Sequence, residues 1–117
     1  MLKVYGISNC DTVKRARTWL TEQNVAFEFH DFKKLGVQEL DLHDWCNAMG
    51  WQQVLNRSGT TWRKADVAQQ AAVVDQATAV HFMVINSSAI KRPVVRWGVG
   101  RWTVGFRPDA FALARLA

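Results

Sequence analysis

The stretch that decides the fold lies at the start of the chain, where residues 2–30 read LKVYGISNCDTVKRARTWLTEQNVAFEFH. Residues 2–7 and 25–30 are rich in apolar, β-branched and aromatic residues and predict two short strands. Between them, apolar residues recur at i, i+3 and i+7 from Val13, which predicts an amphipathic helix that starts near Cys10. Strand, helix and strand within thirty residues indicate a right-handed parallel crossover unit.

The rest of the chain predicts a helical middle and a β-rich end. From about residue 36 to residue 84 the apolar residues follow helical spacing, including one stripe made by Val73, Ala77, Val80 and Val84. Residues 94–97 and 101–104 then flank a Gly-Val-Gly hairpin loop. Pro108 and Asp109 open a last helix, because proline suits the first turn and aspartate its positive end. This order predicts an α/β, thioredoxin-like fold with an inserted α-helical subdomain.

The bulk composition is that of one ordinary globular domain, residues 1–117. Hydrophobic residues make up 49% of the chain and charged residues 21%, which excludes disordered and fibrous classes. No apolar run approaches the ~18 residues of a membrane span, and no signal-peptide pattern opens the chain, so we expect a cytoplasmic protein. The net charge of +5 favours an anionic partner. Lys and Arg are scattered, however, which argues against nucleic acid.

The two cysteines, Cys10 and Cys46, have no metal-ligand spacing, and the histidines add none, so we predict no metal site. Cys10 falls between the first strand and the first helix, where unpaired backbone N–H groups stabilise a thiolate. Lys14 lies one turn further on the same face. The alternative interpretation is that Cys10 is a small buried hydrophobic residue with no chemical role. The position of Cys10 after a strand and before a capped helix favours a reactive thiol instead. Cys46 lies on an apolar helix stripe, which predicts burial.

Four segments together resemble a known family. They are YGISNCDTVKRARTWL from Tyr5, LNRSGTTWR from Leu55, IKRPVV from Ile90 and VGFRPD from Val104. In this order they resemble the arsenate reductase/Spx family, and within it the YffB-like branch. The resemblance covers essentially the whole chain.

The resemblance implies a nucleophile and an oxyanion site. Cys10 matches the nucleophilic cysteine of the family's arsenate reductases. Arg57, Arg92 and Arg107 match the three arginines that hold the oxyanion, a task that suits the planar, permanently charged guanidinium. Taken singly, each arginine is more often a solvated surface residue. The supporting residues expected beside the thiol are Asp11, Thr12, Lys14 and Pro93, the last matching a cis proline of thioredoxin-like folds.

Two departures from the family pattern bear on activity. Val13 stands where a second cysteine would complete a Cys-x-x-Cys pair, so the internal dithiol switch of Spx-type regulators is absent; this argues against the first alternative, an Spx-like regulator that binds RNA polymerase. Residues 5–9 lack the histidine that glutaredoxin-linked arsenate reductases carry before the cysteine, which argues against the second alternative, a genuine arsenate reductase of that type. We therefore expect a monothiol oxidoreductase, resembling arsenate reductase, that acts as a glutathione-dependent thiol reductase. It would hold no bound cofactor, use glutathione or glutaredoxin as its partner, and act on a small anionic or disulfide substrate.

Overall fold

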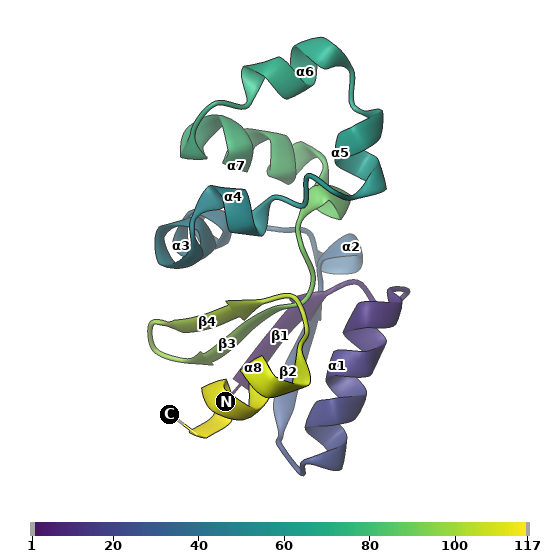
Figure 1. Ribbon diagram of the computed structural model, residues 1–117, viewed down its shortest axis with the longest axis vertical. Helices are drawn as coiled ribbons and strands as arrows, with labels where there is room; N and C mark the ends of the chain where they lie inside the picture. Colours follow the sequence, from purple (N-terminus) through teal and green to yellow (C-terminus); the bar gives the residue numbers. More distant parts are fainter. Residues whose placement is uncertain (1, 117) are drawn as a thin grey trace. The chain divides into compact units, whose positions relative to one another are not determined.

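A computed structural model describes residues 2–116, which form two compact units (Figure 1). Residues 2–36 and 92–116 make the first, here called the sheet unit. Residues 37–91 make the second, here called the helical unit, which interrupts the sheet unit in the sequence. Across residues 2–116, no helix has the length and apolar character needed to cross a membrane.

A four-stranded mixed sheet organises the sheet unit, with strand order β2-β1-β3-β4. The strands are β1 (Leu2–Gly6), β2 (Phe27–Asp31), β3 (Val94–Gly98) and β4 (Arg101–Val104). The helices are α1 (Asp11–Glu22), α2 (Phe32–Leu35) and α8 (Pro108–Leu116). β1 and β2 pair in parallel through the α1 crossover, whereas β1 pairs with β3 and β3 with β4 in antiparallel fashion. The crossover, the hairpin and the last helix expected from the sequence are all confirmed.

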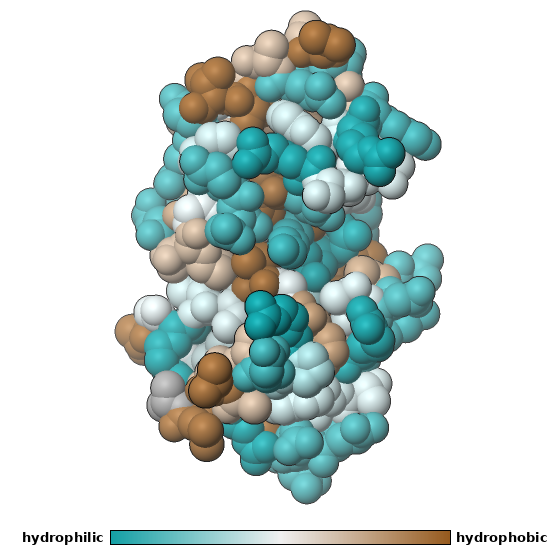
Figure 2. Space-filling view, in the orientation of Figure 1, coloured by the Kyte–Doolittle hydropathy of each residue, from teal (hydrophilic) through white to brown (hydrophobic). Residues whose placement is uncertain are grey.

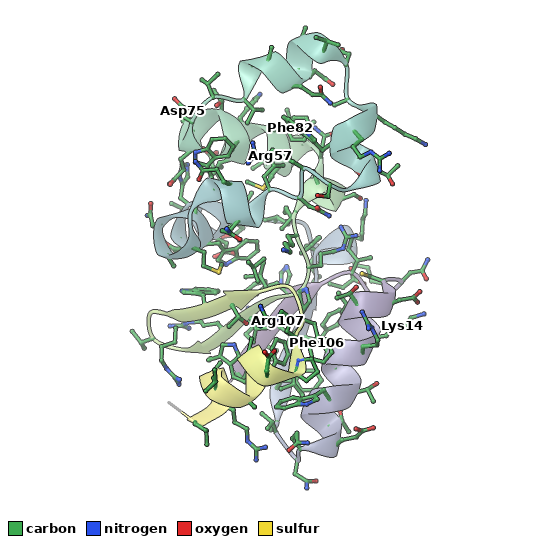
Figure 3. The ribbon with its side chains drawn as sticks, in the orientation of Figure 1. Lys14, Arg57, Asp75, Phe82, Phe106 and Arg107 are labelled. Atoms are coloured by element: carbon green, nitrogen blue, oxygen red, sulfur yellow. The ribbon has the colours of Figure 1, made fainter. Side chains whose placement is uncertain are left out.

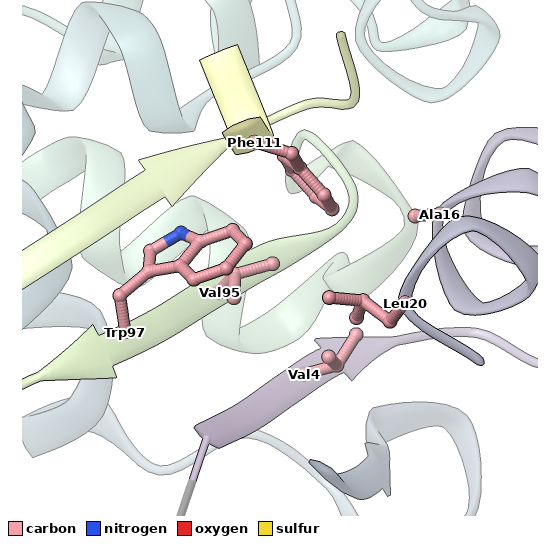
Figure 4. Packing of buried hydrophobic residues seen from close by; sticks show 6 residues of the cluster. All are labelled: Val4, Ala16, Leu20, Val95, Trp97 and Phe111. Atoms are coloured by element: carbon pink, nitrogen blue, oxygen red, sulfur yellow. The ribbon is translucent and has the colours of Figure 1, made fainter. Parts of the chain in front are cut away.

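The core of the sheet unit joins α1 and α8 to one face of the sheet (Figure 4). Phe111 of α8 is fully buried and meets Trp97 and Phe106 edge-on, with ring centroids 5.0 and 4.8 Å apart. The core residues are Val4, Ala16, Leu20, Val95, Trp97 and Phe111. Because Ala16 and Leu20 are fully buried, this packing fixes α1, and with it the thiol at its start, against β1.

The helical unit consists of short helices. They are α3 (Glu39–Met49), α4 (Trp51–Val54), α5 (Thr60–Lys64), α6 (Val67–Ala72), α7 (Gln76–Ile85) and the 3₁₀ helix η1 (Ser87–Ala89). The single stripe expected from Val73 to Val84 is wrong, because α6 ends before Val73 and a new helix starts at Gln76. Asp75 causes the break: its carboxylate accepts from the Thr78 amide at 2.9 Å in a capping box that starts α7 afresh.

Candidate active site around Cys10

Cys10 is the N-cap residue of α1. Its backbone is extended (φ −142°, ψ 121°), and its carbonyl accepts from the Lys14 amide at 2.9 Å to close the first helical turn. The side chain is half-buried. A sulfur in this place faces amides that have no partner within the helix, as the sequence led us to expect.

The surroundings of Cys10 favour the thiolate. Burial raises the pKa of the thiol, but the Val13 amide, the Arg92 guanidinium and the Thr12 amide are near enough to the sulfur to lower it. The charge of Arg92 lowers it further, so the pKa of Cys10 lies below the ordinary value. Thr12 thus contributes through its backbone. Asp11 and Lys14 lie exposed in the first turn of α1.

Arg92 and Pro93 lead into β3 and bring a cation to the thiol. The Arg92–Pro93 peptide bond is cis, as the family resemblance implied. Pro93 is buried, and its carbonyl accepts from the Gly105 amide at 2.9 Å. This anchors the turn from which the Arg92 side chain reaches the sulfur of Cys10.

Arg107 and Arg57, both labelled in Figure 3, contact residues of their own units. Arg107, in the sheet unit, donates through Nη2 to Oδ2 of Asp109 at 2.9 Å, and this hydrogen bond raises its pKa. Arg57, in the helical unit, lies over the Trp51 ring with 5.6 Å between the guanidinium carbon and the ring centroid. The structure therefore brings Arg92 to Cys10, while the roles of Arg57 and Arg107 at the thiol remain predictions.

Asp31 is a site residue that sequence reasoning missed. Its side chain is 8% exposed; Oδ2 accepts from the Ser8 amide at 3.4 Å and Oδ1 from the Lys33 amide at 3.0 Å. Burial raises the pKa of Asp31, but the hydrogen bonds from Ser8 and from the amides of α2 lower it below the usual value. An aspartate after a strand is a helix-cap signal, yet only the fold brings it to Ser8. Asp31 thereby holds the loop that carries Cys10.

Asp31→Asn separates these two hydrogen bonds, because an amide keeps one acceptor oxygen and caps helices as well as aspartate does. We expect the Lys33 amide to stay protected from hydrogen exchange while the Ser8 amide exchanges faster. Amide hydrogen exchange followed by NMR measures both in one sample. Unchanged protection of Ser8 would contradict the role of Asp31 in holding the loop.

The two thiols should differ sharply in reactivity. Cys46 is 3% exposed, and burial raises its pKa to about 11, so only about one molecule in 10⁴ carries that thiolate at neutral pH. We expect iodoacetamide at pH 7 to modify Cys10 and to leave Cys46 intact until the protein is unfolded. Peptide mass spectrometry identifies the modified residue. Equal, slow labelling of both cysteines would show that neither thiol is activated.

Charge is distributed unevenly between the two units. The sheet unit holds eleven of the 15 Lys and Arg but five of the 10 Asp and Glu, for a net charge of +6. The helical unit holds four basic and five acidic residues, for a net charge of −1. The thiol therefore belongs to the basic unit, whose field favours anionic reactants. Across residues 2–116, no group of three His, Cys, Asp or Glu is placed to hold a metal ion.

Comparisons with known proteins agree with the fold described above. The profile of the ArsC family matches residues 5–113. An uncharacterized protein of Haemophilus influenzae is 37% identical over 117 residues, which covers 97% of this chain and 98% of that one. The solved YffB protein is 53% identical with a TM-score of 0.92, covering 97% of this chain and 98% of its own. A Brucella melitensis arsenate reductase (ArsC) related protein is 39% identical with a TM-score of 0.76, covering 96% and 92%. The thioredoxin-like α/β fold predicted from the sequence is confirmed.

Proposed function

The chain belongs to the ArsC family and is an arsenate-reductase-like thiol oxidoreductase, and on this premise we propose that it is a glutathione-dependent disulfide reductase with Cys10 as nucleophile. The observation that carries the proposal is the position of Cys10 at the N-terminus of α1, where Arg92 also lies near the sulfur. Two α1 amides and the Arg92 guanidinium all stabilise the thiolate, which is the form that attacks disulfides.

The reaction proceeds in two exchange steps. The Cys10 thiolate attacks the glutathione sulfur of a glutathionylated substrate, forms a Cys10–glutathione disulfide and releases the substrate thiolate, which takes up a proton. A glutathione thiolate then attacks that adduct, forms oxidised glutathione and restores the Cys10 thiolate. The net reaction consumes one thiol and one mixed disulfide and yields one thiol and one symmetrical disulfide.

The chain supplies no second thiol for the release step. Val13 occupies the place of a resolving cysteine and is fully buried, and Cys46 is buried with a raised pKa. An external thiol must therefore resolve the adduct, and the net charge of +6 on the sheet unit favours an anionic one such as glutathione. Such a role suits a reducing compartment, and we place the protein in the cytoplasm.

A coupled assay tests the proposal. Hydroxyethyl disulfide, glutathione, glutathione reductase and NADPH are mixed with the protein, and NADPH oxidation is followed by absorbance. We expect turnover that depends on both the protein and glutathione. Arsenate replaces the disulfide in a parallel reaction. Turnover of arsenate without turnover of disulfides would favour a true arsenate reductase, and polymerase binding with neither would favour a regulator.

The basic sheet unit also predicts a charge preference. Oxidised glutathione is an anionic disulfide and cystamine a cationic one, so we expect Cys10 to react faster with the first at low salt. Raising the salt should slow the anionic reaction and speed the cationic one, because ions screen the field. Stopped-flow rates at two ionic strengths measure the effect. Salt dependences of the same sign for both disulfides would contradict it.

A further inference from the structure

A surface pocket of about 510 Å³ lies beside α1 in the sheet unit. Its residues, together called the α1 pocket, are Lys14, Arg17, Thr18, Thr21, Glu22 and Phe27. All but Phe27 belong to α1, and Phe27 opens β2, which is an edge strand of the sheet. The face in Figure 2 is mostly hydrophilic, with apolar side chains in separate patches.

The α1 pocket continues the helix face that begins at Cys10. Its α1 residues Lys14, Arg17 and Thr21 follow the cysteine at i+4, i+7 and i+11, a spacing that keeps side chains on one face. Lys14 is exposed on the outer side of α1 (Figure 3). At 1.5 Å per residue, Lys14 lies about 6 Å and Arg17 about 10 Å from Cys10 along the helix axis. A chain that follows this face from the pocket towards the N-terminus of α1 therefore leads to Cys10.

The charges in the pocket are ordered along this face. Lys14 and Arg17 come first, and the carboxylate of Glu22 comes last. The Arg17 guanidinium carbon lies 4.0 Å from the centroid of the Phe29 ring, which holds this cation in place. Half-buried Phe27 adds an apolar wall. The pocket thus favours negative charge close to the thiol and disfavours it at the far end.

We propose that the α1 pocket binds an acidic polypeptide segment of the substrate, so that Cys10 acts on disulfides of peptides or proteins with Asp or Glu near the reacting cysteine. An extended chain advances about 3.3 Å per residue, which places the preferred acidic residues about two and three positions from that cysteine. This inference rests on the disulfide exchange proposed above for Cys10. The bonds made and broken are those of that first step, with the peptide thiol as leaving group.

Three glutathionylated peptides of equal length test the inference. One has Glu two and three positions on either side of its cysteine, one has Gln there, and one has Glu five positions away. We expect the wild-type protein to reduce the first about fivefold faster than the second at low salt, as two exposed ion pairs allow. The third peptide should gain less than the first, because its charge is drawn only by the general field of the basic unit, and Glu22→Gln should speed its reaction, because that change removes the far carboxylate.

Arg17→Gln supplies the pocket variant, and Arg115→Gln is its matched control. Arg115 is an exposed arginine of α8 in the same unit, so both changes remove one positive charge from the sheet unit. We expect Arg17→Gln to lose most of the preference for the acidic peptide and Arg115→Gln to keep it. Thermal unfolding checks that both variants fold. If Arg17→Gln does not fold, the wild-type peptide series and Glu22→Gln decide.

The outcomes distinguish failure of the α1 pocket from failure of the thiol chemistry at Cys10. Equal rates for the Glu and Gln peptides, or equal losses in the two arginine variants, would overturn the pocket while leaving the thiol chemistry intact. Hydroxyethyl disulfide is neutral and too small to occupy the pocket, so with this substrate Arg17→Gln should lose no more of the rate than Arg115→Gln does, since both variants remove one positive charge from the sheet unit. Failure of the wild type with this small disulfide would instead overturn the disulfide exchange at Cys10, and the pocket inference with it.

Discussion

Cys10→Ser is expected to reduce disulfide turnover to the uncatalysed background, whereas Cys46→Ser keeps the wild-type rate. The reason is that both exchange steps pass through one sulfur. Cys10 has donors that lower its pKa, while Cys46 is buried in the helical unit with its pKa raised to about 11. The coupled glutathione assay measures both variants. Activity retained by Cys10→Ser would remove the proposed nucleophile.

The adduct formed on Cys10 gives the same prediction a second readout. Oxidised glutathione should add one glutathione to the protein, and excess thiol should remove it, because the other thiol, Cys46, is buried and its pKa is raised. Intact-mass and peptide mass spectrometry locate the adduct. We expect it on Cys10 in both the wild type and Cys46→Ser. An internal Cys10–Cys46 disulfide would show that the chain resolves its own intermediate and would contradict the monothiol mechanism.

Arg92→Gln is expected to raise the pKa of Cys10 and to slow its reaction with oxidised glutathione at pH 7 by about tenfold. Hydrogen bonds to charged groups contribute about 1.5–3 kcal/mol, and the half-exposed sulfur places this one at the low end. Because Arg92 lowers the pKa, the wild type keeps its thiolate further into acid. The pH–rate profile of the variant should therefore shift upward in pH, and the two curves should converge where both thiols are ionised.

Two further variants separate charge from geometry at Arg92. Arg92→Lys keeps the charge but loses the planar fork, so we expect a rate between those of the wild type and Arg92→Gln. Arg96→Gln is the control: this exposed arginine of β3 stacks near Trp102, 6.0 Å from the ring centroid, and its loss removes the same charge from the same unit. An equal shift in Arg96→Gln would mean that net charge, rather than the contact with the sulfur, sets the pKa of Cys10.

Local patterns predicted the parts of the fold that depend on periodicity. The apolar spacing from Val13 and the proline at Pro108 each mark an element that the structure contains. The break at Asp75 was missed because a side-chain cap overrode an apolar stripe that continued across it. Sequence reasoning placed Cys10 correctly before its helix, since that position depends on neighbouring residues alone.

The partners of the site residues depend on contacts between distant parts of the chain, which periodicity does not encode. Asp31 meets Ser8 across 23 residues, and Arg92 meets Cys10 across most of the chain. The pairing of Arg107 with Asp109 is local, but both charges had been assigned other tasks: oxyanion binding for the arginine and the helix dipole for the aspartate. Residue type therefore suggested which groups are capable of nucleophilic attack or anion binding. Tertiary structure decided which partner each of these groups has.

The antiparallel pairing of β1 with β3 has a consequence for the newly made protein. β1 and the thiol are synthesised first, but β3 and Arg92 follow only after the whole helical unit has been made. A nascent chain therefore carries Cys10 without the cation that lowers its pKa. Until β3 has been synthesised, the thiol lacks the contact with Arg92 that lowers its pKa. The surroundings that favour the thiolate are therefore complete only when the sheet is.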